Sequence, residues 1–158
     1  MAIKIIVKDP DSVLRQEANI VTKFNSNLHK LLDNMADTMY DAEGVGLAAP
    51  QIGILKRVIV MDVGDDHGLI EMVNPEVVSS SGEQIGPEGC LSIPGLRGDV
   101  KRALHVTAKG FDRNGEEIVV EGSELLARCL LHEIDHLNGV LFTDLAIKVY
   151  TEDEEEQE

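Results

Sequence analysis

The segment at residues 125–142, LLARCLLHEIDHLNGVLF, combines residue types that could bind a metal ion and activate water. Its apolar residues recur every three to four positions, which predicts a helix. His132 and His136 are four residues apart, so both imidazoles lie on one helix face and can bind the same metal ion. Glu133 follows the first histidine, where the carboxylate of an H-E-x-x-H motif acts on water beside the metal. The segment therefore predicts a catalytic metal site.

Two histidines need a further protein ligand, and the two cysteines of the chain are the candidates. Cys129 lies seven residues before His136, about 10.5 Å along a helix axis. Metal bonds of about 2.0–2.3 Å cannot easily gather both ends of that span. Cys90 lies between glycines and a proline in residues 88–95, which predict a loop. We therefore expect Cys90 to complete the site and to leave a fourth position for water, while Cys129 forms a wall of the pocket beside the metal.

A third informative stretch, GVGLAAPQ at residues 44–51, is rich in small side chains. Its glycines and alanines allow another backbone to approach closely. The glycine spacing matches no phosphate-binding loop. Two interpretations remain: a structural turn between a helix and a strand, or a strand edge that receives an extended substrate and has the Gln51 amide at its end.

The rest of the chain supplies the elements that must position these groups. Asn25 and its neighbours predict the start of a helix that runs to about Ala42, and Leu14-Arg15 suggests a single helical turn. Ser123 stands where the N-cap of the histidine-bearing helix is expected, and Gly139 suggests that this helix ends near Asn138. Turns are expected at residues 65–68, 79–82 and 112–115. The expected strands are Ile3 to Val7, Arg57 to Asp62, Leu69 to Val78 with an interruption at Asn74-Pro75, Val100 to Phe111, and Glu117 to Glu121.

Composition sets the outer limits on function. A chain of 158 residues is expected to form one catalytic domain over residues 1–150, followed by a disordered acidic tail over residues 151–158. The formal net charge of −15 argues against binding to nucleic acid or to an anionic membrane. Two cysteines, no apolar run long enough to span a membrane and no secretory leader predict a cytoplasmic protein.

Together, GVGLAAPQ, EGCLS and HEIDH resemble the three signature motifs of peptide deformylase, and the resemblance runs from Pro10 to Leu145. It implies an α+β fold with antiparallel β-sheets packed around a central metal-binding helix. It also implies a hydrolase of protein biosynthesis that removes the N-formyl group from the N-terminal formyl-methionine of newly made polypeptides and releases formate. The metal implied is Fe(II), with zinc, nickel or cobalt as substitutes.

The resemblance also assigns roles to residues. Glu133 would act as general base and then general acid on water activated by the metal that Cys90, His132 and His136 hold. The Gln51 side-chain amide and the Leu91 backbone N–H would stabilise the formyl oxygen. The substrate would be bound by Val45, Gly46, Leu125 and Cys129, with Ile85 as a further neighbour.

Some features depart from relatives. Arg128 and Leu131 stand where relatives can carry an apolar residue and a glutamine, so we expect Arg128 to reshape the pocket rim. Gly86-Pro87 also differs from some relatives. Glu88 and Arg102 are expected to form a buried ion pair behind Cys90. The resemblance leaves room for a transient association with the ribosome, although the acidic C-terminal residues argue against the basic-helix docking of some relatives.

Two alternatives come from other classes of protein. A zincin protease also uses H-E-x-x-H, but its third ligand normally lies C-terminal to the motif, where this chain offers Asp144 and the acidic tail. A non-enzymatic, metal-stabilised binding module would explain the ligands but not the combination of Glu133 with Gln51. Activity on unformylated peptides would favour the protease, and inactivity with every metal would favour the module.

Overall fold

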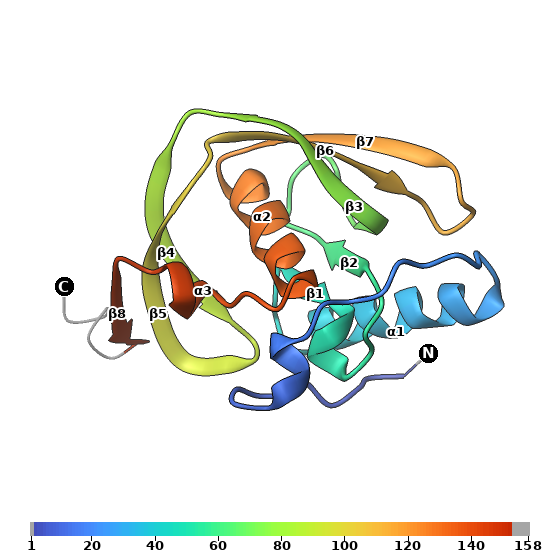
Figure 1. The fold of residues 1–158 in the computed structure, drawn as a ribbon, viewed down its shortest axis with the longest axis horizontal. Helices are drawn as coiled ribbons and strands as arrows, with labels where there is room; N and C mark the ends of the chain where they lie inside the picture. Colours follow the sequence, from blue (N-terminus) through green and yellow to red (C-terminus); the bar gives the residue numbers. More distant parts are fainter. Residues whose placement is uncertain (1, 153–158) are drawn as a thin grey trace.

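The chain folds into two antiparallel sheets that surround one helix, α2, as the computed structural model shows for residues 2–152 (Figure 1). The helices are α1 (Ser26–Asp41), α2 (Leu125–Leu137) and the short α3 (Phe142–Leu145), with 3₁₀ turns η1 (Ser12–Arg15) and η2 (Ala49–Ile52). The strands are β1 (Gly46–Ala48), β2 (Val58–Met61), β3 (Ile70–Ser81), β4 (Gln84–Cys90), β5 (Ile93–Arg102), β6 (His105–Phe111), β7 (Glu117–Ser123) and β8 (Lys148–Thr151). The expected α+β class is confirmed.

The larger sheet has the order β1-β2-β3-β6-β7, and the smaller one has the order β4-β5-β8. The expected interruption of β3 is present, since the register with β6 shifts between Val73 and Glu76. Asn74 has φ +53° there and the next residue is Pro75, a combination typical of a β-bulge. The predicted turn at residues 112–115 joins β6 to β7.

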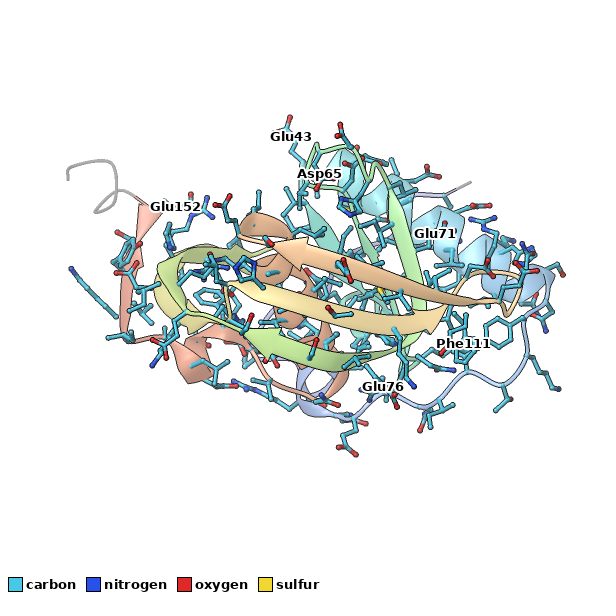
Figure 2. All side chains as sticks on the ribbon, turned by 90° about the horizontal axis from the view of Figure 1, so that it is seen from above. Glu43, Asp65, Glu71, Glu76, Phe111 and Glu152 are labelled. Carbon is cyan, nitrogen blue, oxygen red and sulfur yellow. The ribbon has the colours of Figure 1, made fainter. Side chains whose placement is uncertain are left out.

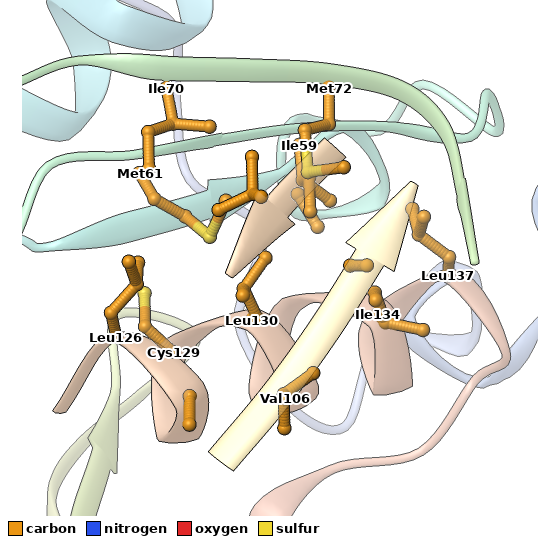
Figure 3. Close-up of a cluster of buried hydrophobic side chains, with 14 of the residues drawn as sticks. Ile59, Met61, Ile70, Met72, Val106, Leu126, Cys129, Leu130, Ile134 and Leu137 are labelled. Carbon is orange, nitrogen blue, oxygen red and sulfur yellow. The ribbon is translucent and has the colours of Figure 1, made fainter. Parts of the chain in front are cut away.

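Helix α2 packs its apolar face against the larger sheet (Figure 3). Leu126, Leu130 and Leu137 recur at helical spacing and are at most 3% exposed, so they share one face. They pack in a cluster with Ile59, Met61, Met72 and Val106 of the sheet. Burial of this face fixes the rotation of α2 about its axis, and thereby the direction in which its histidines point.

Helix α1 begins and ends close to the predicted positions. The Asn25 side chain accepts a hydrogen bond from the Leu28 N–H at 3.2 Å, as expected of an N-cap. Leu32, Met35 and Met39 are fully buried against β1 and β2. This helix therefore supports the glycine-rich segment from behind.

The predicted strand from Ile3 to Val7 is wrong. Ile3 and Ile5 are 59% and 88% exposed, and the segment joins no sheet. Its backbone donors are taken by other partners: Ala2 N–H and Lys4 N–H bind side-chain oxygens on α1, and Val7 N–H binds a carbonyl of η2. These bonds replace the ladder that a strand would need.

The predicted strand from Val100 to Phe111 is two strands in different sheets. Ser81 pairs with His105 in the larger sheet, whereas Gln84 pairs with Arg102 in the smaller one. The chain therefore passes directly from a strand of one sheet to a strand of the other at 82–83 and at 103–104. The turn expected at 79–82 is placed too early. Strand β3 continues as far as Ser81, and the corner is made by Gly82, which has φ +70°.

Three boundaries near the site also differ from the predictions. Cys90 is the last residue of β4 rather than part of a loop. Ser123 ends β7 and its hydroxyl contacts His105 Nδ1 at 2.8 Å, so Glu124, without a side-chain cap bond, stands at the N-cap. After α2, residues 142–145 form the short helix α3, which the sequence analysis did not predict.

The acidic residues Glu43, Asp65, Glu76 and Glu152 are exposed on different elements and are spread over the molecule (Figure 2). No helix within residues 2–152 is long and apolar enough to cross a membrane. Thr151 of β8 pairs with Leu96 of β5, and Glu152 is exposed. The rest of the expected tail, residues 153–158, lies outside the described residues.

Candidate metal centre

Cys90, His132 and His136 lie together, as the sequence predicts. The end of β4 supplies the thiol, and two adjacent turns of α2 supply the imidazoles. Cys90 Sγ is 3.3 Å from His136 Nε2, which is 3.2 Å from His132 Nε2. All three donor atoms lie within 4.8 Å of one another.

This donor set fits a metal ion. Bonds of about 2.0–2.3 Å place the donors of a tetrahedral ion roughly 3.3–3.8 Å apart, close to the separations of the thiol and imidazole atoms. A thiolate with two imidazoles suits iron or zinc. Asp144 is not part of the cluster, because its carboxylate contacts Arg15 and the Leu141 N–H. The protease-like alternative therefore lacks its C-terminal ligand among residues 2–152.

Glu88 orients the first histidine. Its Oε1 lies 2.8 Å from His132 Nδ1 and its carboxylate accepts two hydrogen bonds from Arg102, at 2.8 and 2.9 Å. With Nδ1–H donating to the carboxylate, Nε2 is left free for the metal. Burial raises the pKa of Glu88, but the hydrogen bonds from Arg102 and His132 outweigh it and lower that pKa to about 2. The expected ion pair of Glu88 and Arg102 is confirmed.

Arg128 takes part in the same network, which the sequence analysis missed. Its Nη1 donates to Glu88 Oε2 at 2.6 Å and to the Val100 carbonyl at 3.1 Å. The residue is only 8% exposed, so it is mainly a buried partner of Glu88, although it also lines the cavity described below. The sequence offered one signal for this role, because Arg128 stands between apolar residues of the predicted helix. Such a position indicates burial, and a buried arginine requires an anionic partner.

Glu133 lies beside the histidines with a free carboxylate oxygen. The residue is 4% exposed, and its buried Oε1 has no hydrogen-bond partner among the described residues. Burial is the largest influence on its pKa and raises it to about 7, although the charge of His132 acts in the opposite direction. A carboxylate of this kind can exchange a proton with a reactant near neutral pH.

Gln51 reaches the centre from η2. Its Oε1 accepts a hydrogen bond from the Ala48 N–H at 2.9 Å. Its Nε2 donates to Ser92 Oγ at 3.1 Å and lies 3.5 Å from Cys90 Sγ. An amide donor is therefore held next to the predicted ligand set.

A cavity of about 640 Å³ opens onto these groups. Cys90, His132 and Glu133 lie in its wall, whereas His136 is 1% exposed and lies deeper. The predicted substrate-binding residues Val45, Gly46, Leu125 and Cys129 all line it, as does Leu91, the predicted donor to the formyl oxygen. Ile85 does not line it and is 63% exposed, so its expected place in the pocket is wrong. The sequence analysis did not identify the β5 wall, which includes Pro94, Leu96 and Arg97.

Cys129 has the wall position that helix geometry predicts. Its Sγ lies 3.6 Å from the Val45 carbonyl and outside the metal-ligand cluster. Burial raises the pKa of its thiol well above the ordinary value, with the charge of Glu133 acting in the same direction. The neutral thiol therefore packs between β1 and α2.

Comparison with known proteins gives a consistent result. A family model described as Polypeptide deformylase matches residues 3–152. A peptide deformylase of Alkaliphilus metalliredigens is 55% identical over 94% of this chain and 99% of its own length. Peptide deformylase 1 of Bacillus subtilis is 54% identical over 98% of this chain and 96% of its own length.

Solved structures agree with the sequence comparisons. The crystal structure of a peptide deformylase from Legionella pneumophila superposes with a TM-score of 0.88 at 52% identity. The superposition covers 91% of this chain and 86% of that one. The similarity therefore includes the whole arrangement of sheets around the histidine-bearing helix.

Proposed function

This chain belongs to the peptide deformylase family, and on this premise we propose an assignment of its active centre residue by residue. Membership makes it a metal-dependent hydrolase that removes the N-formyl group from nascent polypeptides. The observation that carries the assignment is the convergence of one thiol and two imidazoles beside a buried, partly unpaired carboxylate.

We propose that Cys90, His132 and His136 hold the metal and that the native ion is Fe(II). Zinc, nickel and cobalt are the expected substitutes, since the same donor types accept them. When bound, the ion polarises the formyl carbonyl and makes water a nucleophile near neutral pH. Glu88 keeps the His132 imidazole in the tautomer that binding requires.

Glu133 is assigned the proton transfers. Its Oε1 has no partner among the described residues, and the residue lies in the cavity wall, where its carboxylate can accept a proton from the attacking water. The same carboxyl group then delivers a proton to the departing amine, so that formate and a free N-terminus are formed.

Gln51 and Leu91 are assigned to the formyl oxygen, which gains negative charge as its carbon becomes tetrahedral. The Gln51 Nε2 lies beside Cys90, and Leu91 follows Cys90 directly in the chain and lines the cavity. A side-chain amide and a backbone N–H at such a position lower the free energy of the transition state.

The peptide is assigned to the edge of β1. This strand lies at one end of the five-stranded sheet order, and Val45 and Gly46 line the cavity. An extended peptide can pair with such an edge through backbone hydrogen bonds. Leu125 and Cys129 then form the pocket for the methionine side chain.

We extend the proposal to the setting of the reaction. Residues 1–150 would form a single catalytic domain of a cytoplasmic protein that meets nascent chains, with at most transient association with the ribosome. The net charge of −15 supports the absence of nucleic-acid binding.

The test is formate release from a formyl-methionyl peptide by protein purified without oxygen, with metal content measured in parallel. We expect release to increase with bound iron, and Cys90→Ala to lose both metal and activity. Cys129→Ala is the matched control for a lost thiol and should keep the metal stoichiometry. Metal binding that survives Cys90→Ala but not Cys129→Ala would refute the ligand assignment, and cleavage of unformylated peptides would favour a protease.

A further inference from the structure

Ser92 contacts the nitrogen end of the Gln51 amide, the end that also lies beside Cys90. Gln51 Nε2 donates to Ser92 Oγ at 3.1 Å, and Gln51 Oε1 accepts from the Ala48 N–H at 2.9 Å. Gln51 is 1% exposed and Ser92 is fully buried. Water therefore cannot easily replace either partner.

The main chains of these two residues are tied to the same short segment. Val7 N–H donates to the Gln51 carbonyl at 2.7 Å, and Asp9 N–H donates to the Ser92 carbonyl at 2.9 Å. The segment thus bridges η2 and the turn between β4 and β5. Because the two backbones are held relative to each other, the distance from the hydroxyl to the amide is a stable property of the fold.

Hydrogen-bond chemistry fixes which way the amide points. A backbone N–H can only donate, so Ala48 requires the amide oxygen, and not the nitrogen, at its side. The amide nitrogen then carries two hydrogens. Ser92 accepts one of them, and the other is left on the side of Cys90, whose Sγ is 3.5 Å from Nε2.

We propose that Ser92 is a positioning residue for deformylation, because its hydroxyl holds one Gln51 N–H and thereby aims the other at the formyl oxygen. This inference rests on the proposed role of Gln51 as the donor to that oxygen. Ser92 itself touches neither the substrate nor the metal ligands in this account. The contribution of Ser92 to kcat should therefore depend entirely on the presence of the Gln51 amide.

A double-mutant cycle of Ser92→Ala and Gln51→Ala tests this dependence. Removal of one oxyanion donor costs about 10²–10³ in kcat, so Gln51→Ala should fall in that range. Ser92→Ala leaves the donor present but badly aimed, and we expect kcat to fall roughly tenfold with KM within about twofold. In the Gln51→Ala background, Ser92→Ala should change kcat by less than about twofold.

Metal content and unfolding by urea are measured for each variant, so that a general loss of structure is recognised. Thr38→Val is the matched control for a lost buried hydroxyl, because Thr38 is 1% exposed, lies on α1 and bonds the Asn34 carbonyl. It should lower stability without changing kcat. A Ser92→Ala variant with normal metal content, whose kcat is lowered only when Gln51 is present, would support the proposal.

The outcomes separate this inference from the function on which it rests. If Gln51→Ala lowers kcat but Ser92→Ala does not, or if Ser92→Ala lowers kcat equally in both backgrounds, Ser92 is not a positioning residue and the role of Gln51 stands. If Gln51→Ala leaves kcat unchanged, both assignments are overturned while the deformylase reaction is retained. Absence of formate release by the metal-loaded parent protein would instead overturn the proposed function.

Discussion

Gly46 lies where β1 passes closest to the proposed general base, and replacing it with alanine tests how tightly the base is held. An ideal Cβ at Gly46 would lie 2.5 Å from Glu133 Oε2 and 2.9 Å from Cys129 Sγ. Gly46 is not among the residues with positive φ, so the backbone itself accepts alanine. The effect of Gly46→Ala is therefore steric and directed at the carboxylate.

The displacement can be worked out from these contacts. An ordinary van der Waals contact with a Cβ is at least 3.4 Å long, whereas the Cβ at residue 46 would lie 2.5 Å from Glu133 Oε2. The oxygen would therefore have to move by about 0.9 Å, the difference between 3.4 and 2.5 Å. Glu133 is 4% exposed and cannot swing into solvent. Since a misplacement of about 1 Å can cost roughly 10²-fold in rate, we expect kcat to fall about 100-fold. Overpacking should lower the free energy of unfolding by about 1–3 kcal/mol. Alanine also restricts the unfolded chain, which should raise the free energy of unfolding by about 0.4–1 kcal/mol and so offset part of that loss.

The assay is formate release under saturating peptide, together with metal content and urea unfolding. Gly86→Ala is the matched control, because its Cβ would meet only the far end of the Arg128 side chain, with the nearest atom at 3.3 Å. We expect that control to keep kcat within about threefold. If Gly46→Ala also keeps kcat within about threefold, either the β1 backbone yields instead of Glu133, or the position of the carboxylate does not limit the reaction. Both results would refute the reasoning.

Three further predictions concern the metal centre and the surface. Glu133→Gln should keep its metal and lose about 10²–10⁴ in kcat, because an amide cannot accept the proton; equal formate release by both proteins would contradict the role. Glu88→Gln should weaken metal binding by about 10–100-fold in competition with a chelator, since it releases His132 Nδ1 and removes the anion that the buried Arg102 and Arg128 share; unchanged affinity would count against the network. The Tyr40 hydroxyl donates to Asp62 at 2.6 Å, and this bond to a carboxylate, together with burial, raises the pKa of Tyr40 to about 12. Asp62→Asn should therefore let Tyr40 ionise at lower pH, as followed by ultraviolet absorbance with the other tyrosine replaced by phenylalanine; identical titrations would refute the pairing.

Local patterns in the sequence determined the parts of this protein that depend on neighbours along the chain. The four-residue spacing of His132 and His136 places both on one face of α2, whatever surrounds that helix. The Asn25 cap and the apolar stripe that follows are likewise sufficient to predict α1. The combination of three short motifs indicated the deformylase family and thereby the α+β fold, because each motif carries residues required for one chemical step.

Tertiary structure alone decided the features that depend on partners far along the chain. The corner at 103–104 divides one expected strand between two sheets, because the chain exchanges its hydrogen-bonding partner there and no local periodicity records the change. Arg128 binds Glu88, 40 residues away, although its difference from relatives suggested a place at the pocket rim. Ser92 holds Gln51 across 41 residues. Local hydrogen bonds and side-chain periodicity depend on residues that are close in the sequence, so a short stretch of sequence predicts them. The hydrogen-bond partner of a buried charge or amide depends instead on how the two sheets pack together.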